Sequence, residues 1–138
     1  MESAGSGADL RLDYFLDGDD VAVVAVAGEV DISTSGRLRE ALLRVVTDEH
    51  GRCLVVNLAD VSFIDSTGIG VLVGVWHRVR ATSSMLALAA PSRQVSAVLQ
   101  TTGLTKMLSV HDTEHEAIQA CRLAAGTDGG SGGGPGGR

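Results

Sequence analysis

The chain has 138 residues and a mass of 14.2 kDa, which is the size of one domain and excludes a pair of catalytic domains. Hydrophobic residues make up 44% and charged residues 20%, so we expect a packed core and exclude a disordered protein. The net charge of −6 and the aromatic content of 3% argue against a nucleic-acid partner, which rewards basic surfaces and aromatic stacking platforms.

A β-hairpin is the first predicted element. Apolar side chains alternate with polar ones over residues 10–16, residues 17–20 (DGDD) favour a turn, and residues 21–27 are a continuous run of Val and Ala. A run of this kind is typical of a buried strand. Apolar residues at helical spacing over 38–46 then predict an amphipathic helix after the hairpin.

Three strand–helix pairs complete the predicted domain. The strands are expected at 53–58, 85–90 and 106–110, and the helices that follow them at 67–81, 93–101 and 114–124. Ser92 opens the second of these helices, Gly103 closes it, and a capping box at 113–116 opens the third. The order ββαβαβαβα predicts an α/β fold with a small mixed β-sheet, parallel at the crossovers, and helices packed against it.

The two ends differ in composition from the rest of the chain. Residues 1–8 are small and polar, and residues 125–138 are dominated by glycine, so we expect both segments to be disordered. Residues 9–124 are then the single folded domain. The chain shows no secretory signal and no apolar run long enough to span a membrane, so a soluble, cytoplasmic protein is expected.

Two cysteines, Cys53 and Cys121, match neither a CxxC redox pair nor a zinc-site spacing, and we expect them to be buried thiols. The segment HDTEH at 111–115 matches an inverted zinc-protease pattern. Thr113 starts the last helix, however, so His111 precedes that helix and the two imidazoles need not share a face. The sequence therefore predicts no metal, no cofactor and no catalytic group.

The turn before the helix at 67–81 carries the most specific chemistry. Ser66 falls at the predicted N-cap, where the helix dipole favours an anion. A phosphate on Ser66 would leave the helix intact and add about −1.5 to −2 charge beside Asp65, as a reversible switch requires. The charge of the chain also changes sign here, because residues 1–65 hold 13 acidic and 5 basic residues whereas residues 66–111 hold 4 basic residues and no acidic one. A plain N-cap at Ser66 remains the alternative.

Glycines in this helix need an explanation, because each costs about 0.5–1 kcal/mol relative to alanine. We expect Gly74 to allow tight packing on the sheet, and Gly68 and Gly70 to leave a bare surface for a partner. Binding of a dinucleotide is disfavoured, because the third glycine is one position too late and no acidic residue ends the next strand.

A second polar turn, at residues 28–34, leads from the strand at 21–27 into the first helix. Helix capping is the commonest use of Asp31, Ser33 and Thr34 in such a position. Because both turns follow strands and precede helices, we expect them to lie on the same edge of the sheet.

Three segments together resemble the bacterial anti-sigma factor antagonists, which are single STAS domains. They are GEVD at 28–31, IDSTGIG at 64–70 and GLTK at 103–106, and the resemblance spans about residues 9–123. It implies a protein that, when unphosphorylated, binds an anti-sigma factor that is also a serine kinase, so that a sigma factor is released. It further implies that this kinase phosphorylates Ser66 and that a serine phosphatase reverses the modification.

The resemblance also implies a docking surface and a protein that is not an enzyme, with an enzyme kept as the last of the alternatives. The residues expected on that surface are Asp31, Ser33, Thr34, Asp65, Thr67, Gly68, Ile69 and Gly70. A monomer or weak dimer is expected, with no direct contact to nucleic acid or membrane. The alternative functions are a STAS subunit of a stress-signalling scaffold and a nucleotide-sensing module.

Overall fold

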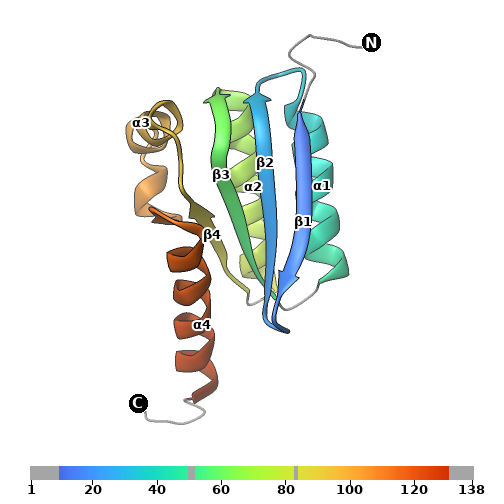
Figure 1. Ribbon diagram of the computed structural model, residues 1–138, viewed down its shortest axis with the longest axis vertical. Helices are drawn as coiled ribbons and strands as arrows, with labels where there is room; N and C mark the ends of the chain where they lie inside the picture. The colour runs from blue at the N-terminus through green and yellow to red at the C-terminus, as the bar shows by residue number, and fades with distance from the viewer. Residues whose placement is uncertain (1–9, 50–51, 83, 131–138) are drawn as a thin grey trace.

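The elements of the computed structural model follow the predicted order ββαβαβαβα (Figure 1). The structure describes residues 10–49, 52–82 and 84–130, and for residues 125–130 it describes the backbone without the side chains. The elements are β1 (Arg11–Asp17), β2 (Val21–Val30), α1 (Ser35–Asp48), β3 (Cys53–Ile64), α2 (Ser66–Ala81), β4 (Leu86–Ala89), α3 (Arg93–Thr101), a 3₁₀ turn (Leu104–Lys106), β5 (Ser109–His111) and α4 (Glu114–Gly130).

The five strands form one mixed sheet in the order β1-β2-β3-β4-β5. β1 is antiparallel to β2, and every later pair is parallel, as the hairpin and the crossovers predict. Val21 lies opposite Cys53 at the start of the β2–β3 pair, and Val30 lies opposite Ile64 at its end. The two strands therefore end together, at the upper edge of the sheet in Figure 1.

Alternate side chains of the central strands pack into two separate apolar clusters, one on each face of the sheet. Leu54, Val56 and Leu58 of β3 point into the larger cluster, which α1, α2 and α3 cover with Leu and Val side chains. Val55 and its neighbours on β2 and β4 point to the opposite face, where Ala117, Ile118 and Cys121 of α4 pack on small residues. The period-2 alternation thus explains why the sheet is buried on both faces.

β2 and β3 extend further than predicted, to Val30 and Ile64 rather than to residues 27 and 58. The last residues of β3 are not a continuous apolar run, because exposed Asp60 and Ser62 interrupt it, and exposed Glu29 does the same in β2. Backbone pairing continues nonetheless, with register shifts that accommodate the irregularity. A strand at 106–110 was also expected, but Gly103 in a left-handed conformation (φ 79°) starts a 3₁₀ turn and pairing begins only at Ser109.

Cys53 and Cys121 are buried, as predicted, but the prediction of free thiols is wrong because the two form a disulfide. Their Cα atoms are 6.0 Å apart although 68 positions separate them in sequence. The bond ties the first residue of β3 to α4, at the end of the sheet away from Val30 and Ile64.

Beside the disulfide, Arg122 of α4 pairs with Asp17 at 2.8 Å and with Asp20 at 3.0 Å, both at the β1–β2 turn. The hydrogen bond from Arg122 lowers the pKa of Asp20 below its ordinary value. This pair therefore stabilises the fold above the unfolded pKa of Asp20, near pH 4, and the contribution is lost as the pH falls through the folded pKa.

We expect the melting temperature of Arg122→Gln to be lower than that of wild type at pH 6, and the difference between the two to shrink below pH 4. A difference in melting temperature that did not change with pH would contradict this prediction.

α4 continues to Gly130, past residue 124 where the sequence placed the end of the domain. One of the two hydrogen bonds of the predicted capping box is present, because the Glu116 amide donates to the Thr113 hydroxyl at 3.1 Å. The glycine content of residues 125–130 disfavours a helix, which is why the sequence placed the end of the domain too early. The predicted disorder at 1–8 and 131–138 lies outside the described residues. None of the described helices is long and apolar enough to cross a membrane.

Candidate functional site

The two polar turns lie on the same edge of the sheet, as predicted. β2 and β3 end side by side, and the Asp65 amide at the end of β3 donates to the Val30 carbonyl at 3.1 Å. The turn at 31–34 and the start of α2 therefore occupy neighbouring positions above the two central strands (Figure 1).

Asp65, rather than Ser66, is the N-cap of α2. Its backbone is extended (φ −114°, ψ −170°), and its carboxylate accepts from the amides of Thr67 at 2.9 Å and Gly68 at 3.3 Å. The prediction was wrong by one residue, because Asp and Ser are equally good N-caps and the longer Asp65 side chain reaches both amides. Ser66 is the first residue of the helix.

Ser66 and Thr67 differ in what their hydroxyls do. The Thr67 side chain is half-buried, and its hydroxyl donates to the Asp65 carboxylate at 2.5 Å. Ser66 is exposed, and its hydroxyl has no hydrogen-bond partner in the part of the chain that the structure describes. Of the two neighbouring hydroxyls, Ser66 is the one presented to solvent.

The second turn is closed by Asp31. Its carboxylate accepts from the Ser33 amide at 2.9 Å, the Ser33 hydroxyl at 2.7 Å and the Thr34 amide at 3.2 Å. The hydrogen bond from the Ser33 hydroxyl is the main reason why the pKa of Asp31 lies below its ordinary value. Asp31 therefore remains charged, and its turn presents a fixed negative charge beside the start of α2.

Three of the residues predicted on the docking surface are buried instead. Thr34 is fully buried and donates its hydroxyl to the Glu29 carbonyl at 2.8 Å, and Ile69 is 7% exposed within the larger apolar cluster. Gly68 is the third. Asp31, Ser33, Asp65, Thr67 and Gly70 are exposed or half-exposed at this edge.

The roles predicted for Gly68 and Gly74 of α2 are exchanged, whereas Gly70 is bare as predicted. A Cβ on Gly68 would lie 2.6 Å from side-chain carbons of both Ile64 and Val30, so Gly68 is the residue that permits tight packing on the sheet. At Gly74, for which tight packing was expected, a Cβ would meet no atom within 4 Å, and the same holds for Gly70. The contact at Gly68 sets the start of α2, and hence Ser66, against the ends of β2 and β3.

Sequence reasoning missed three residues at this edge. Ile32, in the Asp31 turn, is 80% exposed, and Phe63, at the end of β3, is 38% exposed. Gln94 of α3 exchanges hydrogen bonds with the Ile64 backbone at 3.0 and 3.3 Å, which fixes the end of β3 from the other side. The one signal available in the sequence was Ile32, an apolar residue within a polar turn, which could have indicated an exposed apolar side chain.

The histidine segment at 111–115 does not form a metal site in the structure. The His111 ring contacts the Ser109 hydroxyl at 2.5 Å, and Glu114 accepts from the Asn57 side chain at 2.8 Å. Within the described residues, no group of three or more His, Cys, Asp or Glu side chains is placed to hold a metal ion.

With this geometry in place, comparison with known proteins assigns a family. Residues 17–117 match the family model of the STAS domain, and the chain belongs to that family. It is similar to the anti-sigma-B factor antagonist of Listeria monocytogenes, with 36% identity over 93 residues that cover 67% of this chain and 81% of the relative.

Two solved structures extend the similarity to the fold. An anti-sigma factor antagonist from Mycobacterium paratuberculosis superposes with a TM-score of 0.76 at 27% identity, covering 86% of this chain and 99% of the other. The anti-sigma factor antagonist SpoIIAA in its unphosphorylated form gives 0.70 at 25% identity, covering 81% and 96%. The names of these relatives describe regulators and not enzymes.

Proposed function

We propose that this chain is an anti-sigma factor antagonist. In its unphosphorylated form it binds an anti-sigma factor at the edge formed by the Asp31 turn and the start of α2, and a sigma factor is thereby released. The anti-sigma factor is also a serine kinase, which ends the binding by phosphorylating Ser66, and a serine phosphatase restores it.

The observation that carries this proposal is the difference between Ser66 and Thr67. Ser66 offers an exposed hydroxyl that bonds to no described residue, at the start of a helix, whereas the Thr67 hydroxyl donates to Asp65. The Asp65 carboxylate also occupies the amides of Thr67 and Gly68, which would otherwise attract an anion. A phosphate on Ser66 therefore stays on the surface, where it adds about −1.5 to −2 charge next to Asp65.

The relatives support the same function. The Listeria protein is named for opposing an anti-sigma factor, and SpoIIAA is described as having an unphosphorylated form. Like charges placed across an interface cost several kcal/mol, and each 1.4 kcal/mol is tenfold in affinity, so one phosphate could weaken binding about a hundredfold. That is enough to switch partners.

We expect an anti-sigma factor kinase from the same genome, supplied with ATP, to place one phosphate on this chain, at Ser66. Peptide mass spectrometry locates the site. Ser66→Ala should bind the kinase without being phosphorylated, and Ser66→Asp should bind about a hundredfold more weakly in calorimetry.

Ser62→Ala is the matched control, because Ser62 is an exposed serine near the end of β3 that does not start a helix. This variant should be phosphorylated and bind as wild type does. Phosphate on Thr67, or continued phosphorylation of Ser66→Ala, would exclude Ser66 as the switch.

A further inference from the structure

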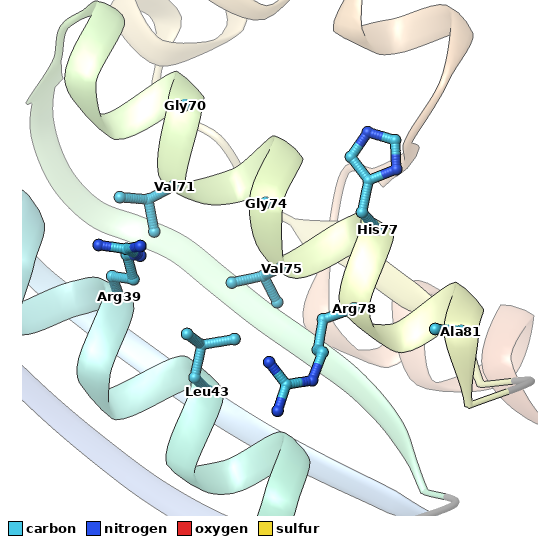
Figure 2. A pocket seen from close by; sticks show the side chains of 9 residues that line it. All are labelled: Arg39, Leu43, Gly70, Val71, Gly74, Val75, His77, Arg78 and Ala81. Carbon is cyan, nitrogen blue, oxygen red and sulfur yellow. The ribbon is translucent and has the colours of Figure 1, made fainter.

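α1 and α2 lie side by side on the sheet and leave a groove between them. It has a volume of about 380 Å³, with Leu43, Val71 and Val75 on its floor and Arg39 and Arg78 on its two sides (Figure 2). A second hollow of about 340 Å³ shares Arg39, Val71 and two glycines with the first and reaches Thr67 and Ser35 at the starts of the helices. We call the two hollows together the α1–α2 groove; its lining includes Thr67, the residue that follows Ser66 in sequence.

The charge of the α1–α2 groove is positive. None of the residues that line the two hollows is acidic, whereas Arg39 and Arg78 contribute a guanidinium from each helix. Neither arginine forms an ion pair or hydrogen bond with any residue that the structure describes, unlike Arg52 and Arg122, which pair with carboxylates. Figure 2 shows Arg78 reaching from α2 toward α1 across the groove.

The wall that α2 contributes is bare backbone at two points. Gly70 and Gly74 are one helical turn apart, both are exposed, and a Cβ at either would meet no atom within 4 Å. Packing among the described residues therefore requires neither glycine, although glycine disfavours a helix relative to alanine. What the missing side chains allow is the close approach of another backbone.

We propose that the α1–α2 groove docks an acidic, amphipathic α-helix of the anti-sigma factor. Its carboxylates pair with Arg39 and Arg78, its apolar side chains cover the floor, and its backbone approaches α2 at the two glycines. The α2 wall runs from Thr67 to Ala81, or roughly 21 Å at 1.5 Å per residue, which accommodates a helix of about four turns.

This inference rests on the proposed function and adds a physical reason for it. An acidic occupant that extends toward Thr67 would approach a phosphate on Ser66 with charge of the same sign. Phosphorylation would then repel the occupant of the groove directly, in addition to altering the Asp31 and Asp65 turns.

The test uses the anti-sigma factor that phosphorylates Ser66, titrated calorimetrically against variants of the full chain. We expect Arg39→Glu, Arg78→Glu and Gly74→Leu each to weaken binding about tenfold or more, because two reverse the charge and the third fills the groove. Arg80→Glu is the matched control, because Arg80 lies on α2 but stacks on Trp76, 4.6 Å from its ring centre, outside the groove lining. Its affinity should remain within about twofold of wild type.

Folding is checked separately with Gly74→Ala, which should melt higher than wild type because alanine favours the helix and nothing occupies its space. An Arg39→Glu defect that is repaired by exchanging one acidic residue of the partner for Arg would support the docked helix.

If all three groove variants bound the anti-sigma factor with wild-type affinity, the inference would be overturned and the proposed function would remain intact. If the wild-type chain dimerised and Arg39→Glu did not, the occupant of the groove would be a second copy of this chain, and the inference would be overturned. If inorganic phosphate or ATP alone saturated the groove, the occupant would be a small anion, and the inference would be overturned as well. An anti-sigma factor that does not bind the wild-type chain at all would overturn both proposals.

Discussion

Replacing Cys121 by Ser is expected to lower the free energy of unfolding of the oxidised protein by about 4 kcal/mol, because the disulfide closes a loop across 68 positions of sequence. α4 depends on this bond more than the other helices do. It is the helix that covers the second face of the sheet, and it packs there mainly on small side chains such as Ala87 and Ala89. Guanidinium denaturation of the oxidised wild type and the variant measures the difference.

Reduction provides the internal control for this prediction. Wild type treated with dithiothreitol should unfold at the same denaturant concentration as Cys121→Ser, and Cys53→Ser should add no further loss when combined with it. Amide exchange should be faster in α4 of the reduced protein and unchanged in α2. Equal stability of the oxidised and reduced proteins would mean that the bond contributes nothing to the fold.

Replacing Gly68 by Ala is expected to lower the free energy of unfolding by about 2 kcal/mol, in the range of overpacked cores. The added Cβ would lie 2.6 Å from carbons of Ile64 and Val30, whereas carbon atoms pack best at about 3.5–4 Å. Both neighbours are at most 1% exposed, so neither can move into solvent. The start of α2 must shift instead, and Ser66 shifts with it.

Gly70→Ala tests whether the loss at Gly68 comes from packing or from helix propensity. With no atom in its way, this exchange should raise the free energy of unfolding by about 0.5–1 kcal/mol. Thermal unfolding followed by circular dichroism reports both variants. If Gly68→Ala were as stable as wild type, the tight packing of α2 on the ends of β2 and β3 would not hold.

Features determined by neighbouring residues could be read from the sequence. Ser92 and Thr113 cap α3 and α4 as predicted, since a cap depends on a side chain and an amide two or three residues later. The order of the elements and the shared edge of the two turns followed from hydrophobic periodicity and the geometry of parallel strands. At residues 65–66 the same local reasoning could not decide which residue is the N-cap, because both side chains are good caps.

Features determined by distant residues could not be read in this way. The cost of a glycine in a helix is a local property, but which glycine faces Val30 depends on how α2 lies on the sheet, and so Gly68 and Gly74 exchanged their predicted roles. The same limit applies to the Cys53–Cys121 bond and to Gln94, whose partners lie 68 and 30 positions away. Ile32 and Phe63 were missed because exposure is a property of the folded edge.

The length of β2 has an electrostatic consequence for the Ser66 switch. The strand is ten residues long, so its two ends are roughly 30 Å apart at 3.3 Å per residue. The acidic β1–β2 turn lies at one end and Ser66 beyond the other, whereas the screening length at physiological ionic strength is only about 8 Å. Asp17, Asp19 and Asp20 therefore exert almost no field at Ser66. The charge that a phosphate meets is set by Asp31, Asp65 and Arg39, which lines the groove beside Thr67, and not by the net charge of −6.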